Sequence, residues 1–148
     1  MKLFWVDVRP WRKNLATTAI ESGADALLVD DAERVRELGR VTTIAPDGDL
    51  VPGKDVFEVE IVDKESEEEA LRLSRQGQVI VRTQDWTVIP LENLVAQSER
   101  IIAAVSNAEE AKVALTVLER GAAGIMLSTD DPAEIRRRNV VPASAMPH

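Results

Sequence analysis

The sequence predicts an α/β fold in which mostly parallel strands and helices alternate in a (β/α) barrel-like domain, an incomplete TIM barrel included. Seven short apolar segments, several of them rich in β-branched residues, begin near residues 3, 26, 41, 56, 79, 101 and 123. Helical patterns that end at Gly23, Gly39, Gly77 and Gly121 each lead into one of these segments. A helix that leads into each strand favours parallel pairing. No Gly-x-Gly-x-x-Gly follows the first strand, which favours a barrel over a doubly wound sheet.

The first part of the chain alternates predicted strands and helices. The expected strands are 3–8, 26–29, 41–45 and 56–62, and the expected helices are 13–22, 32–38 and 64–75. Asp31 is expected to cap the second helix. Residues 46–55 are rich in Pro, Gly and Asp, so they are predicted to form a surface loop. In the strand at 56–62, the apolar residues face one way and Glu58 and Glu60 face the other.

The second part is organised around residues 79–96. There a β-branched strand is followed by a polar turn and by a helix that begins near Pro90. Further strands are expected at 101–105 and 123–127, and Ser106 with Glu109 predicts a capping box for a helix over 108–120. The barrel-like domain is expected to span 1–138, followed by a disordered tail at 139–148.

Composition excludes several kinds of site and partner. The chain has 148 residues and a net charge of -8, which argues against nucleic acid and anionic membranes as partners. It has no cysteine, and its one histidine is the last residue, His148. Thiolate metal sites and a Ser-His-Asp triad are therefore not expected, and no metal site is predicted. No apolar stretch is long enough to span a membrane, so a cytoplasmic protein that acts on a small molecule is expected.

In a parallel barrel, functional side chains gather at the C-terminal ends of the strands. The polar or aromatic side chains that follow predicted strands are Asp7, Arg9, Lys13, Arg82, Asp85, Trp86, Ser128, Thr129 and Asp130. A structural interpretation stands beside this one, in which Trp86 closes the barrel mouth and Arg82 pairs with Asp85. In the same way, Asp130 and Asp131 can cap a helix, and Trp5 can be part of the core.

Several segments resemble the archaeal-type 3-dehydroquinate synthases, the 3-dehydroquinate synthase II family. They are residues 4–11, 19–26, 85–93, 107–112 and 127–132. The most specific is Asp-Trp-Thr-x-Ile-Pro-Leu-Glu-Asn at 85–93, and the similarity runs from Met1 to about Ile135. Family members are roughly twice as long, and their second half is missing here.

The resemblance implies NAD-dependent oxidative deamination of 2-amino-3,7-dideoxy-D-threo-hept-6-ulosonate. Cyclisation of the product gives 3-dehydroquinate, an intermediate of the shikimate pathway of aromatic amino-acid biosynthesis. The resemblance places the residues that bind NAD in the missing half.

Such chemistry needs a cation for a carboxylate and a group that takes up a proton. Arg82 is the candidate for the substrate carboxylate, because a guanidinium can donate two parallel hydrogen bonds. Asp7 or Asp85 is expected to be the base, and Lys13 a base or a transient imine former. The remaining candidates for substrate binding are Trp86 and Ser128.

Two other functions remain open from the sequence. A truncated, non-catalytic homologue could act as an oligomerising or regulatory module, because an incomplete barrel leaves an open sheet edge. A different barrel enzyme could act on a phosphorylated substrate, although no glycine-rich phosphate loop is present. Whichever function the chain has, self-association into a homo-oligomer is expected to cover the open edge.

Overall fold

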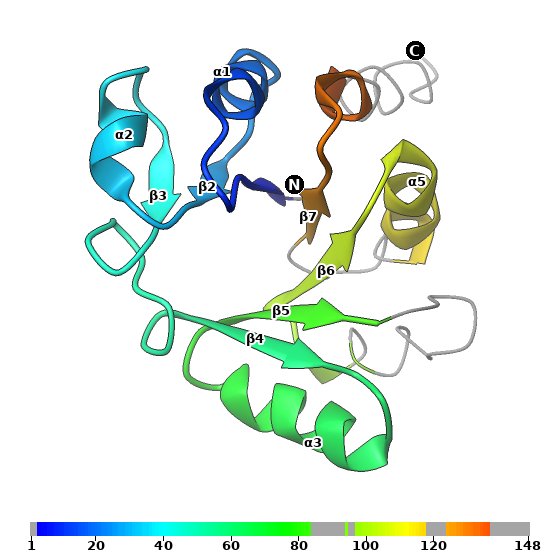
Figure 1. The fold of residues 1–148 in the computed structure, drawn as a ribbon. Coiled ribbons are helices and arrows are strands. Elements are labelled where there is room, and N and C mark those ends of the chain that lie inside the picture. The colour runs from blue at the N-terminus through cyan, green and yellow to red at the C-terminus, as the bar shows by residue number, and fades with distance from the viewer. Residues whose placement is uncertain (1–2, 84–93, 95–96, 118–123, 137–148) are drawn as a thin grey trace.

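Seven strands form one parallel sheet in the computed structural model, which describes residues 3–83, 94, 97–117 and 124–136 (Figure 1). The strands are β1 (Leu3–Asp7), β2 (Ala26–Leu28), β3 (Thr42–Ile44), β4 (Val56–Glu60), β5 (Gln78–Arg82), β6 (Ile101–Val105) and β7 (Gly124–Ser128). Every neighbouring pair is parallel, and the order is β3-β2-β1-β7-β6-β5-β4. The prediction of a parallel, incomplete barrel-like α/β fold is confirmed.

The strand order shows where the curled sheet is closed and where it is open. β1 pairs directly with β7, so the first and last described strands close one side of the barrel. β3 and β4 follow each other in the chain but lie at opposite ends of the strand order. The gap between them is a seam in the barrel wall.

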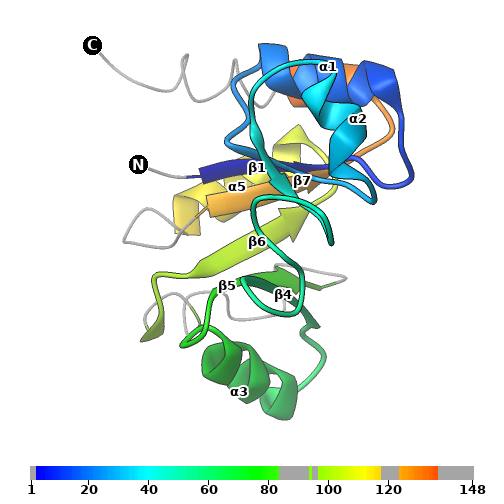
Figure 2. The same cartoon turned by 90° about the vertical axis from the view of Figure 1, so that its left-hand side faces the viewer.

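The segment Leu50–Gly53 lies along this seam. Leu50 forms a parallel bridge with Ile44 of β3, and Pro52 forms one with Val56 of β4. The Gly53 N–H also donates to the Val56 carbonyl at 2.8 Å. Figures 1 and 2 show this part of the chain as the loops between β3 and β4. Residues 46–55 are a loop, as predicted, but part of that loop pairs with both edges of the sheet. Self-association through an open edge stays a prediction.

Helices cover the outer face of the curled sheet (Figures 1 and 2). They are α1 (Lys13–Glu21), α2 (Ala32–Arg36), α3 (Lys64–Leu73) and α5 (Ala108–Val117), and residues 132–136 form a further helical turn. The apolar side of α1 contributes Leu15, Ala16 and Ala19 to the buried core. The helix predicted to begin near Pro90 lies mostly outside the described residues, as does the tail. No helix in the described part of the chain is long and apolar enough to cross a membrane.

Two helix caps test the sequence predictions directly. The Asp31 carboxylate accepts a hydrogen bond from the Glu33 N–H at 3.0 Å, so the predicted cap of α2 is confirmed. The capping box predicted for α5 from Ser106 and Glu109 is wrong by one residue. Asn107 is the cap, because its side chain accepts the Glu110 N–H at 2.8 Å. Its carbonyl also accepts the first helical hydrogen bond, from Ala111.

Alternate strand residues build two cores, one on each face of the sheet. The outer core lies between sheet and helices. The inner core fills the barrel with Trp5, Ala26, Leu28, Ile44, Val56, Ile80, Ile102, Ala104 and Met126. Trp5 is therefore a core residue, as the structural alternative for it proposed. Because alternate residues share a face, the residues two positions beyond these inner-core residues also face inward, nearer the C-terminal ends of the strands.

Candidate functional site

Four polar side chains face inward just beyond the inner core. Asp7 follows Trp5 on β1, Glu58 follows Val56 on β4, Arg82 follows Ile80 on β5, and Ser128 follows Met126 on β7. They lie at or near the strand ends where active sites of parallel barrels form.

The Asp7 carboxylate is the centre of this group. Its Oδ1 accepts the N–H and Nε–H of Arg9, at 3.1 and 2.9 Å. Its Oδ2 accepts Nη2 of Arg9 at 3.0 Å, Nη2 of Arg82 at 3.2 Å and the Ser128 hydroxyl at 3.1 Å. Asp7 is a buried residue, so five donors saturate a carboxylate that has lost most of its water. Three strands are joined through this one side chain.

Glu58 of β4 adds a second carboxylate to the group. Its Oε1 accepts Nη2 of Arg9 at 2.9 Å and lies 3.8 Å from Nη2 of Arg82. Asp7, Arg9, Glu58 and Arg82 thus form a charged quartet whose formal charge is zero. No role was predicted for Arg9 from the sequence, and Glu58 was not among the predicted site residues. The signal for Glu58 was its place opposite the apolar side chains of its strand, which in a barrel points to the lumen.

Electrostatics fix the protonation state of the quartet. Burial alone would raise the pKa of Asp7, but the hydrogen bonds and positive charge of Arg9, with the charge of Arg82, hold that pKa below its ordinary value. The hydrogen bond to Asp7 in turn raises the pKa of Arg9. Asp7 is consequently a carboxylate at neutral pH, and a weaker base than an ordinary aspartate.

Arg82 keeps hydrogen-bond donors that the quartet does not use. Its Nη2 contacts Asp7, while among the described residues no partner is found for its Nε or Nη1. One third of its side chain is exposed, at 33%. A guanidinium fixed at one corner with free donors on another can bind a carboxylate.

The other predicted site residues lie elsewhere or outside the described residues. Lys13 is exposed at the start of α1 and lines a hollow with Trp11, Arg34, Glu37 and Leu38 in the helical layer. The structure therefore brings Asp7, Arg82 and Ser128 together but does not place Lys13 among them. Asp85 and Trp86 lie outside the described residues, so their roles stay predictions.

The Asp130-Asp131 pair has structural contacts. Asp130 forms an ion pair with Arg12, which precedes α1. Asp131 accepts the Ala133 N–H at 2.9 Å and caps the helical turn at 132–136, as the structural alternative proposed. In the described ranges no three acidic or histidine side chains gather in a way that could hold a metal ion.

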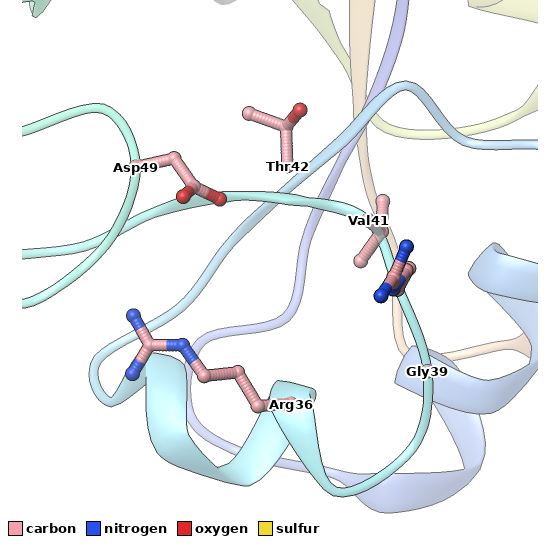
Figure 3. A pocket seen from close by; sticks show the side chains of 6 residues that line it. Arg36, Gly39, Val41, Thr42 and Asp49 are labelled. Carbon is pink, nitrogen blue, oxygen red and sulfur yellow. The ribbon is translucent and has the colours of Figure 1, made fainter.

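Two further hollows differ in their relation to the quartet. One, of about 550 Å³, lies by the start of β3 and is lined by Arg36, Gly39, Arg40, Val41, Thr42 and Asp49 (Figure 3). Arg36 there already pairs with Glu33 at 2.7 Å and donates to the Asp47 carbonyl at 3.0 Å, so it connects α2 to the following loop. The other, of about 350 Å³, lies at the seam and includes Arg9 and Glu58 in its lining. Of the three hollows found among the described residues, this seam pocket is the one whose lining includes residues of the quartet.

Comparison with known proteins identifies the family. The sequence model of the 3-dehydroquinate synthase II N-terminal domain matches residues 1–141. The chain belongs to the 3-dehydroquinate synthase II family. The 3-dehydroquinate synthase of Methanoculleus marisnigri is 85% identical over 137 residues, which cover 93% of this chain and 42% of that protein. The 3-dehydroquinate synthase of Methanoregula boonei is 62% identical over 136 residues, covering 92% of this chain and 41% of that protein.

A less similar relative matches the same part of the chain. A 3-dehydroquinate synthase homologue of Aquifex aeolicus is 49% identical over 140 residues, covering 93% of this chain and 42% of that protein. The chain thus spans less than half the length of these relatives.

Solved structures support the barrel architecture. Phosphoribosylanthranilate isomerase from Thermotoga maritima superposes with a TM-score of 0.69 at 13% identity, covering 99% of this chain and 100% of that one. The Pyrococcus furiosus isomerase gives 0.68 at 12% identity, covering 98% of this chain and 100% of that one. At such low identity the similarity establishes the fold only.

Proposed function

We propose that this chain supplies the substrate-binding mouth of a 3-dehydroquinate synthase II. The observation that carries the proposal is the convergence of β1, β5 and β7 on the Asp7 carboxylate, in a chain of this family. In the proposed reaction, 2-amino-3,7-dideoxy-D-threo-hept-6-ulosonate is oxidatively deaminated and cyclised to 3-dehydroquinate, in the shikimate pathway.

Arg82 is the proposed ligand of the substrate carboxylate. Its Nε and Nη1 would donate to the two carboxylate oxygens, while its Nη2 stays on Asp7. The Asp7 contact limits the rotamers of a long side chain before the substrate arrives, which lowers the entropy cost of binding. Ser128 has a parallel role, because its hydroxyl is already oriented by Asp7 and its oxygen can still accept from a substrate hydroxyl.

The proton-transfer role fits Asp7 poorly. A general base works best when its pKa lies near the working pH, and the pKa of Asp7 is lowered. Asp7 is therefore proposed as a positioning residue for Arg9, Arg82 and Ser128. The base is then proposed to be Asp85, the other aspartate expected in that role from the sequence.

NAD, which the family resemblance implies, does not fit the described residues. The seven glycines of the chain form no Gly-x-Gly-x-x-Gly, and the two arginines of the quartet are neutralised by two carboxylates. A pyrophosphate needs free backbone N–H groups or surplus positive charge. We propose that the residues that bind NAD are absent from this chain. Little or no turnover is therefore expected from the 148-residue chain alone.

Binding of 3-dehydroquinate, which carries a carboxylate, tests the site without turnover. Titration of this compound into the chain should release measurable heat, and Arg82→Ala should abolish it, because the free donors are lost. The melting temperature of Arg82→Ala should stay close to that of the original chain, since Asp7 keeps four of its five donors.

Arg72→Ala is the matched control, because Arg72 is an exposed arginine in the last turn of α3. It removes the same charge and should leave binding unchanged. Equal binding by Arg82→Ala and the original chain would place the carboxylate site elsewhere. Unfolding of Arg82→Ala would make Arg82 a structural residue.

A further inference from the structure

The seam pocket combines an apolar wall with two opposite charges. Its volume is about 350 Å³, at the small end of the roughly 300–1,000 Å³ typical of ligand pockets. Leu28 and Val56 line it from the inner core, and Pro52 lines it from the segment that covers the seam. Arg9 and Glu58 supply the charges, with one third of each side chain exposed, at 33% and 37%.

Both charged groups keep unused hydrogen-bonding capacity. Nη2 of Arg9 is 2.9 Å from Oε1 of Glu58, and Nε and Nη2 of Arg9 also contact Asp7. In the part of the chain that the structure describes, no partner is found for Nη1 of Arg9 or for Oε2 of Glu58. Within this one ion pair, a free cationic donor and a free anionic acceptor therefore lie close together.

We infer that the seam pocket binds a free α-amino acid with an apolar side chain. The ligand carboxylate would accept from Nη1 of Arg9, and its ammonium would donate to Oε2 of Glu58, both as charge-assisted hydrogen bonds. Its side chain would lie against Leu28, Val56 and Pro52, which exclude water from it. The two charges of the head group are neighbours, like those of the Arg9–Glu58 pair.

Other ligand classes match this lining less well. A simple anion would leave Glu58 beside a negative charge, and a simple cation would leave Arg9 beside a positive one. A sugar acid with several hydroxyls would place them against Leu28 and Val56, where no described polar side chain is available to receive them. A dinucleotide is much larger than a pocket of this volume.

The pocket is distinct from the proposed carboxylate site, although they share the quartet. Arg82, Asp7 and Ser128 are not among the residues that line it. A ligand there would contact Arg9, the residue that donates three of the five hydrogen bonds to Asp7. This inference does not depend on the proposed enzyme activity.

Calorimetric titration of the chain with amino acids tests the inference. L-leucine and L-phenylalanine should bind when titrated to about 10 mM, a range that reveals millimolar sites. L-leucinamide lacks the carboxylate and N-acetyl-L-leucine lacks the ammonium, so each should bind at least about tenfold more weakly. L-serine has the same head group without the apolar body and should also bind more weakly.

Variants distinguish binding in the seam pocket from binding at the proposed carboxylate site of Arg82. Glu58→Gln keeps an acceptor for Arg9 but loses the charge that holds the ammonium, so leucine affinity should fall about tenfold or more. Glu60→Gln, two residues on along β4 and outside the lining, is the matched control and should bind leucine as the original chain does. Arg82→Ala should lose 3-dehydroquinate but keep leucine, so the two proposals fail separately.

Several results would overturn the inference. They are an absence of leucine and phenylalanine binding at about 10 mM, equal binding of leucinamide or N-acetyl-leucine, equal binding of serine, and unchanged leucine affinity in a folded Glu58→Gln variant.

Discussion

Gly124 lies against the backbone of Leu3 so closely that a Cβ at position 124 would overlap that backbone. The contact is where β7 pairs with β1, with Leu3 and Gly124 as register partners. It closes the side of the barrel on which the strands holding Ser128 and Asp7 lie next to each other. The hydrogen bond from Ser128 to Asp7, 3.1 Å long, depends on this approach.

Gly124→Ala should therefore destabilise the fold and disturb the site together. The added methyl group has no space unless β7 moves away from β1, which we expect to cost about 3 kcal/mol or more. In a chain of about 150 residues this corresponds to a drop in melting temperature of roughly 6–12 °C. Thermal unfolding followed by circular dichroism measures it.

Gly23→Ala is the control for the glycine-to-alanine change itself. Gly23 has a φ of 85°, but a Cβ there would meet no atom within 4 Å. Only backbone strain remains, at about 1 kcal/mol. If the two variants lose equal stability, the close approach at Leu3 is not what requires Gly124.

The cap of α5 provides a second comparison between neighbours. Asn107→Ala should lower stability by about 1 kcal/mol, because the Glu110 N–H loses its acceptor. Ser106→Ala should stay within about 0.5 kcal/mol, since the Ser106 side chain is exposed. Urea unfolding of both variants measures the difference. A larger loss in Ser106→Ala would restore the cap first predicted from the sequence.

Periodicity was sufficient to predict the strands and to place three residues of the candidate site at strand ends. Asp7, Arg82 and Ser128 each end a short apolar strand, and parallel strands present such ends on one side of a sheet. Their convergence follows from local sequence and one rule of topology. Lys13 also follows the first strand, but it begins α1 on the exposed side of that helix, and short-range spacing did not reveal this.

Tertiary arrangement determined what the sequence could not predict. The direct pairing of β1 with β7 leaves the seam between β3 and β4, two strands that are neighbours in the chain. Leu50 pairs with β3 and Pro52 pairs with β4, although their segment has the composition of a surface loop. Glu58 faces the lumen only because the sheet curls, and on a flat sheet the same alternation would expose it to solvent.

Gln78, the first residue of β5, has a side-chain oxygen that is unpaired among the described residues and whose cost can be measured. Its Oε1 is buried, and no hydrogen bond to it is found within the described ranges. Gln78→Met removes that acceptor at similar volume and should leave stability unchanged or raise it by about 1 kcal/mol. Gln78→Glu should lower it, since a charge would replace the unpaired oxygen. A clear loss of stability in Gln78→Met would show that the amide has a partner in solution.

Asp7 makes stability depend on pH in a predictable direction. Its pKa is lower in the folded protein than in the unfolded chain, so folding favours the ionised carboxylate. The stabilisation is present above the ordinary aspartate range, and it is lost as the pH falls below roughly 4 and through the lowered value.

Asp7→Asn should accordingly lose about 2 kcal/mol at pH 7, because hydrogen bonds to a charged group are replaced by weaker ones. The difference between Asp7→Asn and the original chain should stay constant between about pH 5 and 8 and shrink below roughly pH 4. Glu68→Gln, on the exposed side of α3, removes the same charge and should remain within about 0.5 kcal/mol. Unfolding in urea across this pH range measures all three proteins. A difference that instead vanished between pH 6 and 8 would mean that Asp7 titrates near neutrality, and would return it to the role of general base.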